Sequence, residues 1–275
     1  MLIAALCCTI SAQATPYWFD GFDVSANTSD INFETAARQG GAPAPIAWTA
    51  NIADYHVQMF GGGGTPLQLA GDGFGTFPAP TMASPSADFT GHVAGEVIGK
   101  KVEVTMDAFA NNTGGTYFTQ SAITVAASAP LTQSGAPGGG FSVVFIEDTF
   151  GGNGNFIQLW DGSTIVGNLI PNPAGAGGGF VEIFIDDPTD GDPWDGVGET
   201  SFGVLVNSTP VGVYSRGGGG FTSNYITLEG SDQKAGVTLA THTFDNLLVS
   251  SFPIPEPSAA VLCALGLIGM GWRRR

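Results

Sequence analysis

The chain is poor in cysteine. Its only cysteines are Cys7, Cys8 and Cys263, which all lie in terminal segments, so residues 15–254 contain none. A body without cysteine has no disulfide bond, no thiol nucleophile and no cysteine-ligated metal. It must therefore be stabilised by its own hydrophobic core, which a domain of this length can build.

Basic side chains are also scarce. The chain has 8 Lys and Arg against 24 Asp and Glu, a formal net charge of -16, and three of the eight are the last three residues. Because phosphates would be repelled, this balance excludes nucleic acid as a partner. The same acidic field favours solubility and attracts divalent cations.

Helical periodicity is missing as well. No stretch of the body keeps a helical period for three turns, whereas 42 glycines and 17 prolines supply many turns. Short apolar or alternating segments predict strands at residues 17–22, 52–60, 96–109, 117–126, 141–146, 156–160, 163–166, 180–185, 200–206, 211–214, 225–228 and 241–250. This rhythm predicts one all-β domain, an antiparallel β-sandwich of the jelly-roll type, over residues 15–247, followed by a linker at 248–254.

Three segments predict finer detail. Residues 102–108 alternate between apolar and polar side chains, which indicates a half-buried strand. Residues 141–146 are almost continuously apolar, which predicts a strand covered on both faces. Asp161-Gly162 between two apolar runs predicts a hairpin with a two-residue turn.

The last predicted strand carries a resemblance. Its sequence Phe244-Asp245-Asn246-Leu247-Leu248-Val249-Ser250 resembles the final strand of concanavalin A-like, or laminin G-like, sandwiches of bacterial surface proteins. The resemblance implies the same two-sheet fold for this body.

The first residues read as a signal peptide. Leu2 to Ile10 is apolar, and Ala12-Gln13-Ala14 fits the small-x-small rule for cleavage before Thr15. No Lys or Arg precedes the apolar stretch, which departs from the usual pattern. Residues 1–14 therefore predict export.

The C-terminus has three ordered features: Pro255-Glu256-Pro257, an uncharged run over residues 258–272, and Arg273-Arg274-Arg275. As a helix the run would span roughly 22 Å, short of the ~30 Å hydrocarbon core, and the arginines would stay on the cytoplasmic face. This order resembles the PEP-CTERM sorting signal, which implies an exosortase that recognises the tripeptide and removes the tail after a transient stay in the inner membrane. A plain C-terminal anchor and a buried helix are the alternatives.

An acidic loop is the sharpest local feature of the body. Residues 186–195 hold five aspartates bent by prolines and a glycine. Asp190, Asp192 and Asp195 are the best candidates for ligands of a calcium ion, the one cofactor that the sequence suggests. Trp194 breaks the spacing of the known calcium-loop motif, so a solvated acidic hairpin tip is the competing interpretation.

Catalytic patterns are weak. Glu182 and Asp186 share a strand face but lie some 13 Å apart, beyond the ~5 to 9.5 Å of glycosidase pairs. The compact Glu-x-Asp-x-x-Glu arrangement and the Gly-x-Ser-x-Gly elbow are absent, and His56, His92 and His242 lack the spacing of a zinc site. Aromatic residues that could contact a sugar are Trp160, Trp194, Tyr214 and Tyr225.

These observations predict an exported cell-surface or extracellular-matrix protein, non-enzymatic and associated with exopolysaccharide, as in a biofilm. Its partners would be the exosortase, the membrane before processing, and the polysaccharide. The alternative is a surface glycan-active enzyme, a glycoside hydrolase or lyase on a β-sandwich. The sequence assigns no catalytic residue.

Overall fold

The architecture was analysed in a computed structural model of the chain. It describes residues 15–40, 45–49, 57–59, 67–70, 82–88, 99–109, 118–125, 140–148, 154–162, 164–173, 178–187, 197–216, 225–232 and 241–252. The proposed signal peptide, the acidic loop at residues 188–196 and the C-terminal segment from residue 253 lie outside these ranges.

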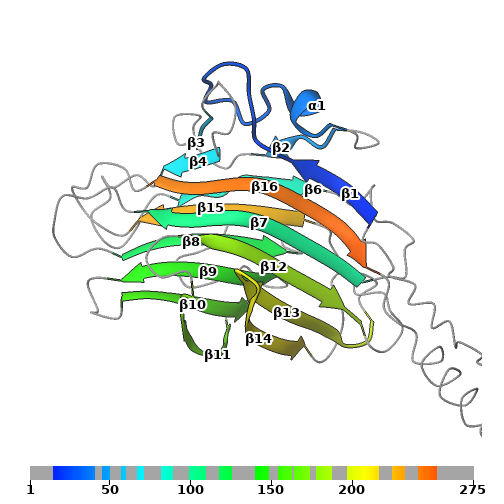
Figure 1. Ribbon diagram of the computed structural model, residues 1–275, viewed down its shortest axis with the longest axis vertical. Helices are drawn as coiled ribbons and strands as arrows, with labels where there is room; N and C mark the ends of the chain where they lie inside the picture. Colours follow the sequence, from blue (N-terminus) through cyan, green and yellow to red (C-terminus); the bar gives the residue numbers. More distant parts are fainter. Residues whose placement is uncertain are drawn as a thin grey trace, which may run out of the picture.

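The described chain is an all-β sandwich of two antiparallel sheets (Figure 1). Its elements are β1 (Thr15–Asp20), α1 (Thr35–Arg38), β2 (Trp48–Thr49), β3 (Val57–Gln58), β4 (Leu67–Ala70), β5 (Met82–Ala83), β6 (Ser86–Asp88), β7 (Gly99–Phe109), β8 (Phe118–Val125), β9 (Phe141–Asp148), β10 (Gly154–Asp161), β11 (Thr164–Pro171), β12 (Gly179–Asp186), β13 (Thr200–Val206), β14 (Thr209–Arg216), β15 (Tyr225–Asp232) and β16 (Thr241–Phe252).

The two sheets have similar strand orders. The first runs β14-β13-β12-β7-β16-β4-β3, with β1 also paired to β16. The second runs β11-β10-β9-β8-β15-β6-β2, with β5 also paired to β15. The predicted fold class, an antiparallel β-sandwich, is therefore confirmed.

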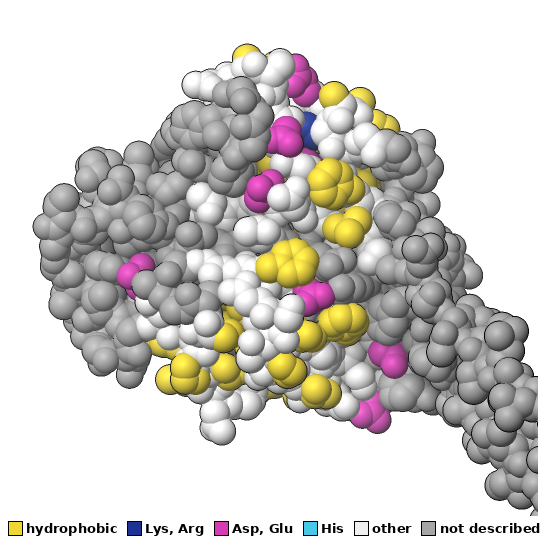
Figure 2. Space-filling view, in the orientation of Figure 1, with side chains coloured by type: hydrophobic (Ala, Val, Ile, Leu, Met, Phe, Trp, Pro, Cys, Tyr) yellow, Lys and Arg dark blue, Asp and Glu magenta, His cyan; other side chains and the backbone are white. Residues whose placement is uncertain are grey.

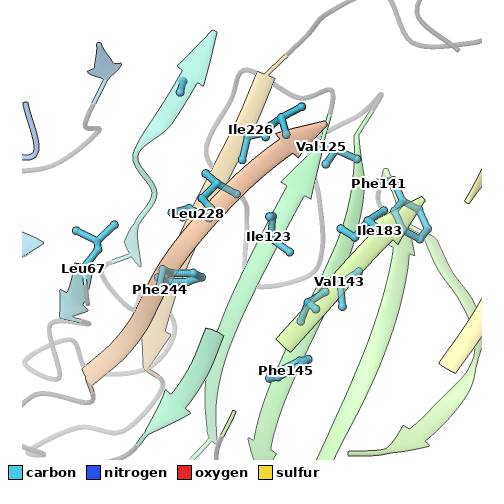
Figure 3. Close-up of a cluster of buried hydrophobic side chains, with 14 of the residues drawn as sticks. Leu67, Ile123, Val125, Phe141, Val143, Phe145, Ile183, Ile226, Leu228 and Phe244 are labelled. Carbon is cyan, nitrogen blue, oxygen red and sulfur yellow. The ribbon is translucent and has the colours of Figure 1, made fainter. Parts of the chain in front are cut away.

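The hydrophobic core lies between the sheets. Figure 3 shows side chains from both sheets pointing toward one another, among them Ile183 and Phe244 from the first sheet and Ile123, Phe145 and Leu228 from the second. Alternate residues of strands such as β9, β12 and β13 supply this layer, as the two-residue period of a strand requires. Phe141 and Phe202 stack across the core with ring centroids 4.1 Å apart.

Two boundaries differ from the sequence-based expectation. The β10–β11 hairpin forms, but Asp161 belongs to the strand rather than to the turn, because it pairs with Thr164 of β11 and with Phe141 of β9. Its carboxylate accepts a hydrogen bond from the Tyr214 hydroxyl. Strand β16 continues to Phe252, paired with β7, so the segment from Leu248 to Phe252 is strand rather than linker.

One end of the sandwich is covered by residues 20–40 and 45–49, and we call it the closed edge. The carboxylate of Asp20, fully buried, is its centre. Its Oδ1 accepts from the Phe22 amide at 2.9 Å, and its Oδ2 accepts from Arg38 Nη2 at 3.2 Å, Gln39 Nε2 at 3.0 Å and Trp48 Nε1 at 3.0 Å. One buried carboxylate thus joins β1, α1 and β2.

Two side-chain amides complete the closed edge. Asn32 donates to the Trp48 carbonyl at 2.8 Å and accepts from the Trp48 amide at 2.7 Å. Gln39 bonds both backbone groups of Ile46 in the same way, at 2.9 and 2.7 Å. Each amide takes the two hydrogen bonds that a neighbouring strand would take, so this edge offers no free ladder there.

Candidate functional site

The outer face of the second sheet is a second buried layer. On β9, Phe141, Val143 and Phe145 face the first sheet, whereas Ser142, Val144 and Ile146 face away from it, and all six are buried. The prediction of a strand covered on both faces is confirmed. The apolar members of this outer layer are Ala122, Val144, Ile146, Phe156 and Trp160.

Glu229 is a carboxyl group within that outer layer. It lies beside Ala122 in the β8–β15 register, is 1% exposed, and its Oε2 has no hydrogen-bond partner. Burial raises the pKa of Glu229 well above its usual value, so the folded chain keeps this proton to a higher pH than an exposed glutamate would.

Glu229 has no second carboxylate at hydrolytic spacing among the described residues whose side chains are placed on its face. Asp88 is the carboxylate on that face, and it pairs with Tyr225, four positions along β15 from Glu229. Four residues at ~3.3 Å, together with the step to the next strand, separate the two groups by roughly 14 Å. Both glycosidase geometries need ~5 to 9.5 Å.

A serine and a histidine, of the kinds found in catalytic sites, also form a buried pair. Ser121 Oγ and His242 Nδ1 are 2.8 Å apart, and both residues are fully buried. A Cβ placed on Gly230 would lie 2.6 Å from His242 Cδ2, so backbone fills the space beside the ring. Because no substrate can reach it, this pair is a structural link between the sheets, as expected for an ordinary strand histidine; His56 and His92 lie outside the described residues.

The acidic loop is described only at its two ends. Burial, and then the neighbouring Asp187 carboxylate, raise the pKa of Asp186. Gly198, at φ +80°, closes against Asp187, since a Cβ there would lie 2.6 Å from Asp187 Oδ2. The candidate ligands Asp190, Asp192 and Asp195 lie outside the described residues, and the described part of the chain holds no group of three or more metal-binding side chains.

The sheet ends opposite the closed edge form what we call the open edge, strands β11 and β14. No described strand pairs with the outer side of either one. A cleft of about 250 Å³ lies between them, lined by Leu159, Val166, Gly167, Asn168, Ile170, Val211, Gly212, Val213 and Tyr214. Figure 2 shows hydrophobic side chains gathered over the lower part of the molecule, where Figure 1 places β11, β13 and β14.

At the polar end of the cleft, Arg216 and the Tyr214 hydroxyl satisfy the Asp161 carboxylate. Tyr214 donates its hydroxyl hydrogen to Asp161 Oδ2 at 2.9 Å, and Arg216 Nε lies 3.6 Å from Asp161 Oδ1. Burial, together with the Asp161 hydrogen bond, raises the pKa of the Tyr214 hydroxyl, so Tyr214 stays neutral. The ring of Tyr214 stacks at 6.3 Å on buried Phe141, which fixes its position at the cleft wall.

The four aromatic candidates separate in the structure. Tyr214 lines the cleft, whereas Trp160 belongs to the outer layer of the second sheet and donates to Gln158 Oε1 at 3.2 Å. Tyr225 lies on the same sheet face and hydrogen-bonds Asp88, whose charge raises the pKa of the phenol. Trp194 lies outside the described residues.

Sequence reasoning missed Asn168 and the apolar rim of the cleft. The available signal was the absence of charge: the eight residues of β11 carry none, and β14 carries only Arg216. Native edge strands usually carry charged side chains that prevent pairing with another chain.

Comparisons with known proteins bear on the tail and the fold. Residues 253–275 match the PEP-CTERM protein-sorting motif, which indicates an exported protein sorted to the cell envelope. Among the described residues no helix is long and apolar enough to cross a membrane. A search of curated proteins gave no match.

Solved structures agree with the concanavalin A-like fold. An endo-1,3-β-glucanase from Streptomyces sioyaensis aligns at TM-score 0.53 and 13% identity, covering 88% of this chain and 97% of its own. A Bacillus licheniformis β-glucanase (TM-score 0.43, 11% identity, 82% and 96% covered) and a legume lectin-like domain from Entamoeba histolytica (0.44, 7%, 75% and 87%) are also similar. The likeness to the S. sioyaensis structure supports the two-sheet fold of the body.

Proposed function

We propose that this chain is a non-enzymatic surface or matrix protein that associates with the exopolysaccharide of its own cell, and that it holds the polysaccharide at the open edge. The observation that carries the proposal is the cleft between β11 and β14. It combines apolar walls, the Asn168 amide and a fixed tyrosine ring in one accessible place. Sugar rings offer the matching surfaces, namely apolar C–H faces bordered by hydroxyl groups.

The comparisons add indirect support. The S. sioyaensis protein that shares the fold is named an endo-1,3-β-glucanase, an enzyme that acts on a polysaccharide. The sorting motif supports export to the cell envelope, where a polysaccharide made by the same cell would be within reach. We further propose that residues 1–14 are removed on export, and that an exosortase removes the tail after its transient stay in the inner membrane.

The direct test is binding of the full chain to purified host exopolysaccharide. Saturable binding without release of reducing ends or unsaturated products is the expected result. Absence of binding would refute the proposal. For the tail, the intact mass of the protein purified from its host should lack residues 258–275, and a mass that includes them would show that the tail is retained.

Calcium is tested in the same experiment. If the loop holds the ion, binding or the melting temperature falls in chelator, and D190N combined with D192N removes that difference. If chelator and the double variant change neither quantity, the loop is a solvated acidic tip and the metal site is wrong.

A glycan-active enzyme is the second candidate, and one observation favours it. Burial raises the pKa of Glu229, which favours the protonated form that a general acid requires. Against it stand the burial of Glu229 and the roughly 14 Å separation from Asp88, estimated from the strand register. Product release by the wild type that disappears in E229Q would establish the enzyme.

A further inference from the structure

We propose that the cleft of the open edge recognises an acetyl group on a neutral sugar residue of the polysaccharide, rather than a bare sugar ring or an acidic sugar. This inference rests on the proposed function and names the part of the ligand that enters the cleft. It depends on three features of the cleft itself: its size, its polar side chains and its charge.

The size of the cleft limits what enters it. Gly212 pairs with buried Val204, so it lies on the inner side of β14, and a Cβ there would be 2.9 Å from Leu159 Cδ1. Leu159 therefore closes the cleft behind Gly212. The volume of about 250 Å³ equals the space of about eight water molecules at ~30 Å³ each. That space suits one substituent with part of a single sugar ring, and not several linked rings.

The polar side chains of the cleft are few. On β11 the cleft is lined by Val166, Asn168 and Ile170, and the β10 register passes from Val166 directly to Ile170, so Asn168 lies in a bulge. Asn168 is exposed. Tyr214, which also lines the cleft, donates its hydroxyl hydrogen to Asp161. Among the lining side chains, all of them in the described chain, Asn168 is thus the one that can donate a hydrogen bond to a ligand.

An acetyl group matches that arrangement better than a bare sugar ring. A hexose brings hydroxyl groups on most of its carbons, and each one that leaves water for the aliphatic walls without a new partner opposes binding. An acetyl group instead brings a methyl group for those walls and one carbonyl oxygen, which can accept from the Asn168 amide. The remaining hydroxyl groups of the sugar stay in water at the mouth of the cleft.

The charge near the cleft favours a neutral sugar. Arg216 Nε lies 3.6 Å from Asp161 Oδ1, so the guanidinium beside the cleft already has a carboxylate partner. Strand β11 has no charged residue, and the whole chain carries a formal charge of -16. A carboxylate or sulfate on the sugar would therefore be repelled, whereas an acetyl group is uncharged whether it is linked as an ester or as an amide.

The test uses three neutral probes that differ in the acetyl group. Methyl glucoside has none, methyl N-acetylglucosaminide has an amide-linked one, and methyl 6-O-acetylglucoside has an ester-linked one. Their binding to the full chain is measured by ligand-observed NMR. Host polysaccharide is compared before and after mild alkali, which removes ester-linked but not amide-linked acetyl groups.

Two variants probe the cleft and one is the control. N168L removes the amide at nearly constant volume, and V211F fills the cleft from the wall where Val211 is partly exposed. L169N is the matched control, because Leu169 follows Asn168 on β11 and is 49% exposed but does not line the cleft. The melting temperature of each variant verifies that it is folded.

We expect at least one acetylated glycoside to bind and methyl glucoside not to bind. N168L should weaken that binding about tenfold, V211F should abolish it, and L169N should leave it unchanged. Binding of the host polysaccharide should fall after alkali if its acetyl groups are ester-linked. If they are amide-linked, binding should survive alkali and be displaced by excess methyl N-acetylglucosaminide.

Three results would overturn the inference. One is binding of methyl glucoside as strong as that of the acetylated glycosides. Another is binding of an acetylated glycoside that N168L and V211F leave intact. The third is host polysaccharide binding that neither alkali nor an excess of either acetylated glycoside reduces, in which case the proposed function stands without an acetyl site. Failure to bind the host polysaccharide and all three glycosides would refute both proposals.

Discussion

The two ends of the sandwich are built in opposite ways. At the closed edge, β2 and β3 are two residues long, and a buried network centred on Asp20 joins β1, α1 and β2. At the open edge, β11 and β14 are each eight residues long, nearly uncharged, and carry exposed apolar side chains around a cleft.

The difference shows which end the fold protects. A sheet edge exposes unpaired backbone groups, and at the closed edge side-chain amides satisfy them. The same chain offers no such cover at the open edge among its described residues. The cleft at the open edge has apolar walls and an uncovered mouth, which is why we place ligand binding there.

The largest expected effect is at the closed edge. In D20A the buried Arg38 guanidinium loses its counter-ion, and Gln39 and Trp48 lose an acceptor. Removing one partner of a buried pair costs about 3–5 kcal/mol, and chemical denaturation measures it. Polysaccharide binding by the fraction that stays folded should be unchanged, because the open edge is at the other end of both sheets. A loss below about 1 kcal/mol would mean that Asp20 does not hold the closed edge.

A smaller loss of stability is expected when Gln39 is replaced, because its side-chain amide bonds only uncharged backbone groups of Ile46. Q39L keeps the volume of buried Gln39 but leaves the two backbone groups of Ile46 without partners, which costs about 1–3 kcal/mol for each group that stays dry. N168L is the matched substitution at the open edge, where Asn168 is exposed and the expected change lies within about 0.5 kcal/mol. Equal effects on the midpoint of denaturation would remove the distinction between the two edges.

The sequence predicted the open edge less well than the strands beside it. Alternation in residues 200–206 and the continuous run at 141–146 identified β13 and the doubly covered β9, because burial of one or both faces determines those patterns directly.

The order of strands, in contrast, depends on pairing between distant segments. Strands β11 and β14 become neighbours at one end only because their hairpin partners β10 and β13 lie in different sheets. No local sequence pattern predicts this strand order. The closed edge could not be predicted for the same reason, because Asp20, Gln39 and Trp48 come from three separate segments of the chain. The Glu229 environment was also invisible, since its neighbours come from β8.

A third, intermediate effect depends on pH and concerns Glu229, whose strand β15 pairs with β6 of the closed side. Its pKa is raised by burial in the folded chain, so the folded state keeps the proton to higher pH than the unfolded state. Stability from this group therefore falls as pH rises from about 4.5 toward the folded pKa, by about 1.4 kcal/mol per pH unit.

E229Q removes this titration while keeping the shape. We expect the variant to have a higher melting temperature than the wild type at pH 8, and nearly the same one at pH 4.5, with a gain that grows as the pH rises toward the folded pKa. A stability difference that does not change between the two pH values would show that Glu229 does not titrate in this range.

The smallest expected effect is at the open edge itself, and its smallness makes it informative. Val204 and Val213 are valines on the adjacent strands β13 and β14, but Val204 is buried in the core whereas Val213 is 83% exposed. V204A should cost about 2 kcal/mol through lost burial and a cavity, and V213A within about 0.5 kcal/mol. If V213A nevertheless weakens polysaccharide binding, the contribution of Val213 lies in contact with a ligand rather than in the stability of the fold. If V213A destabilises the chain as much as V204A, this edge is packed against something in the free protein, and the two ends of the sandwich differ less than their side chains indicate.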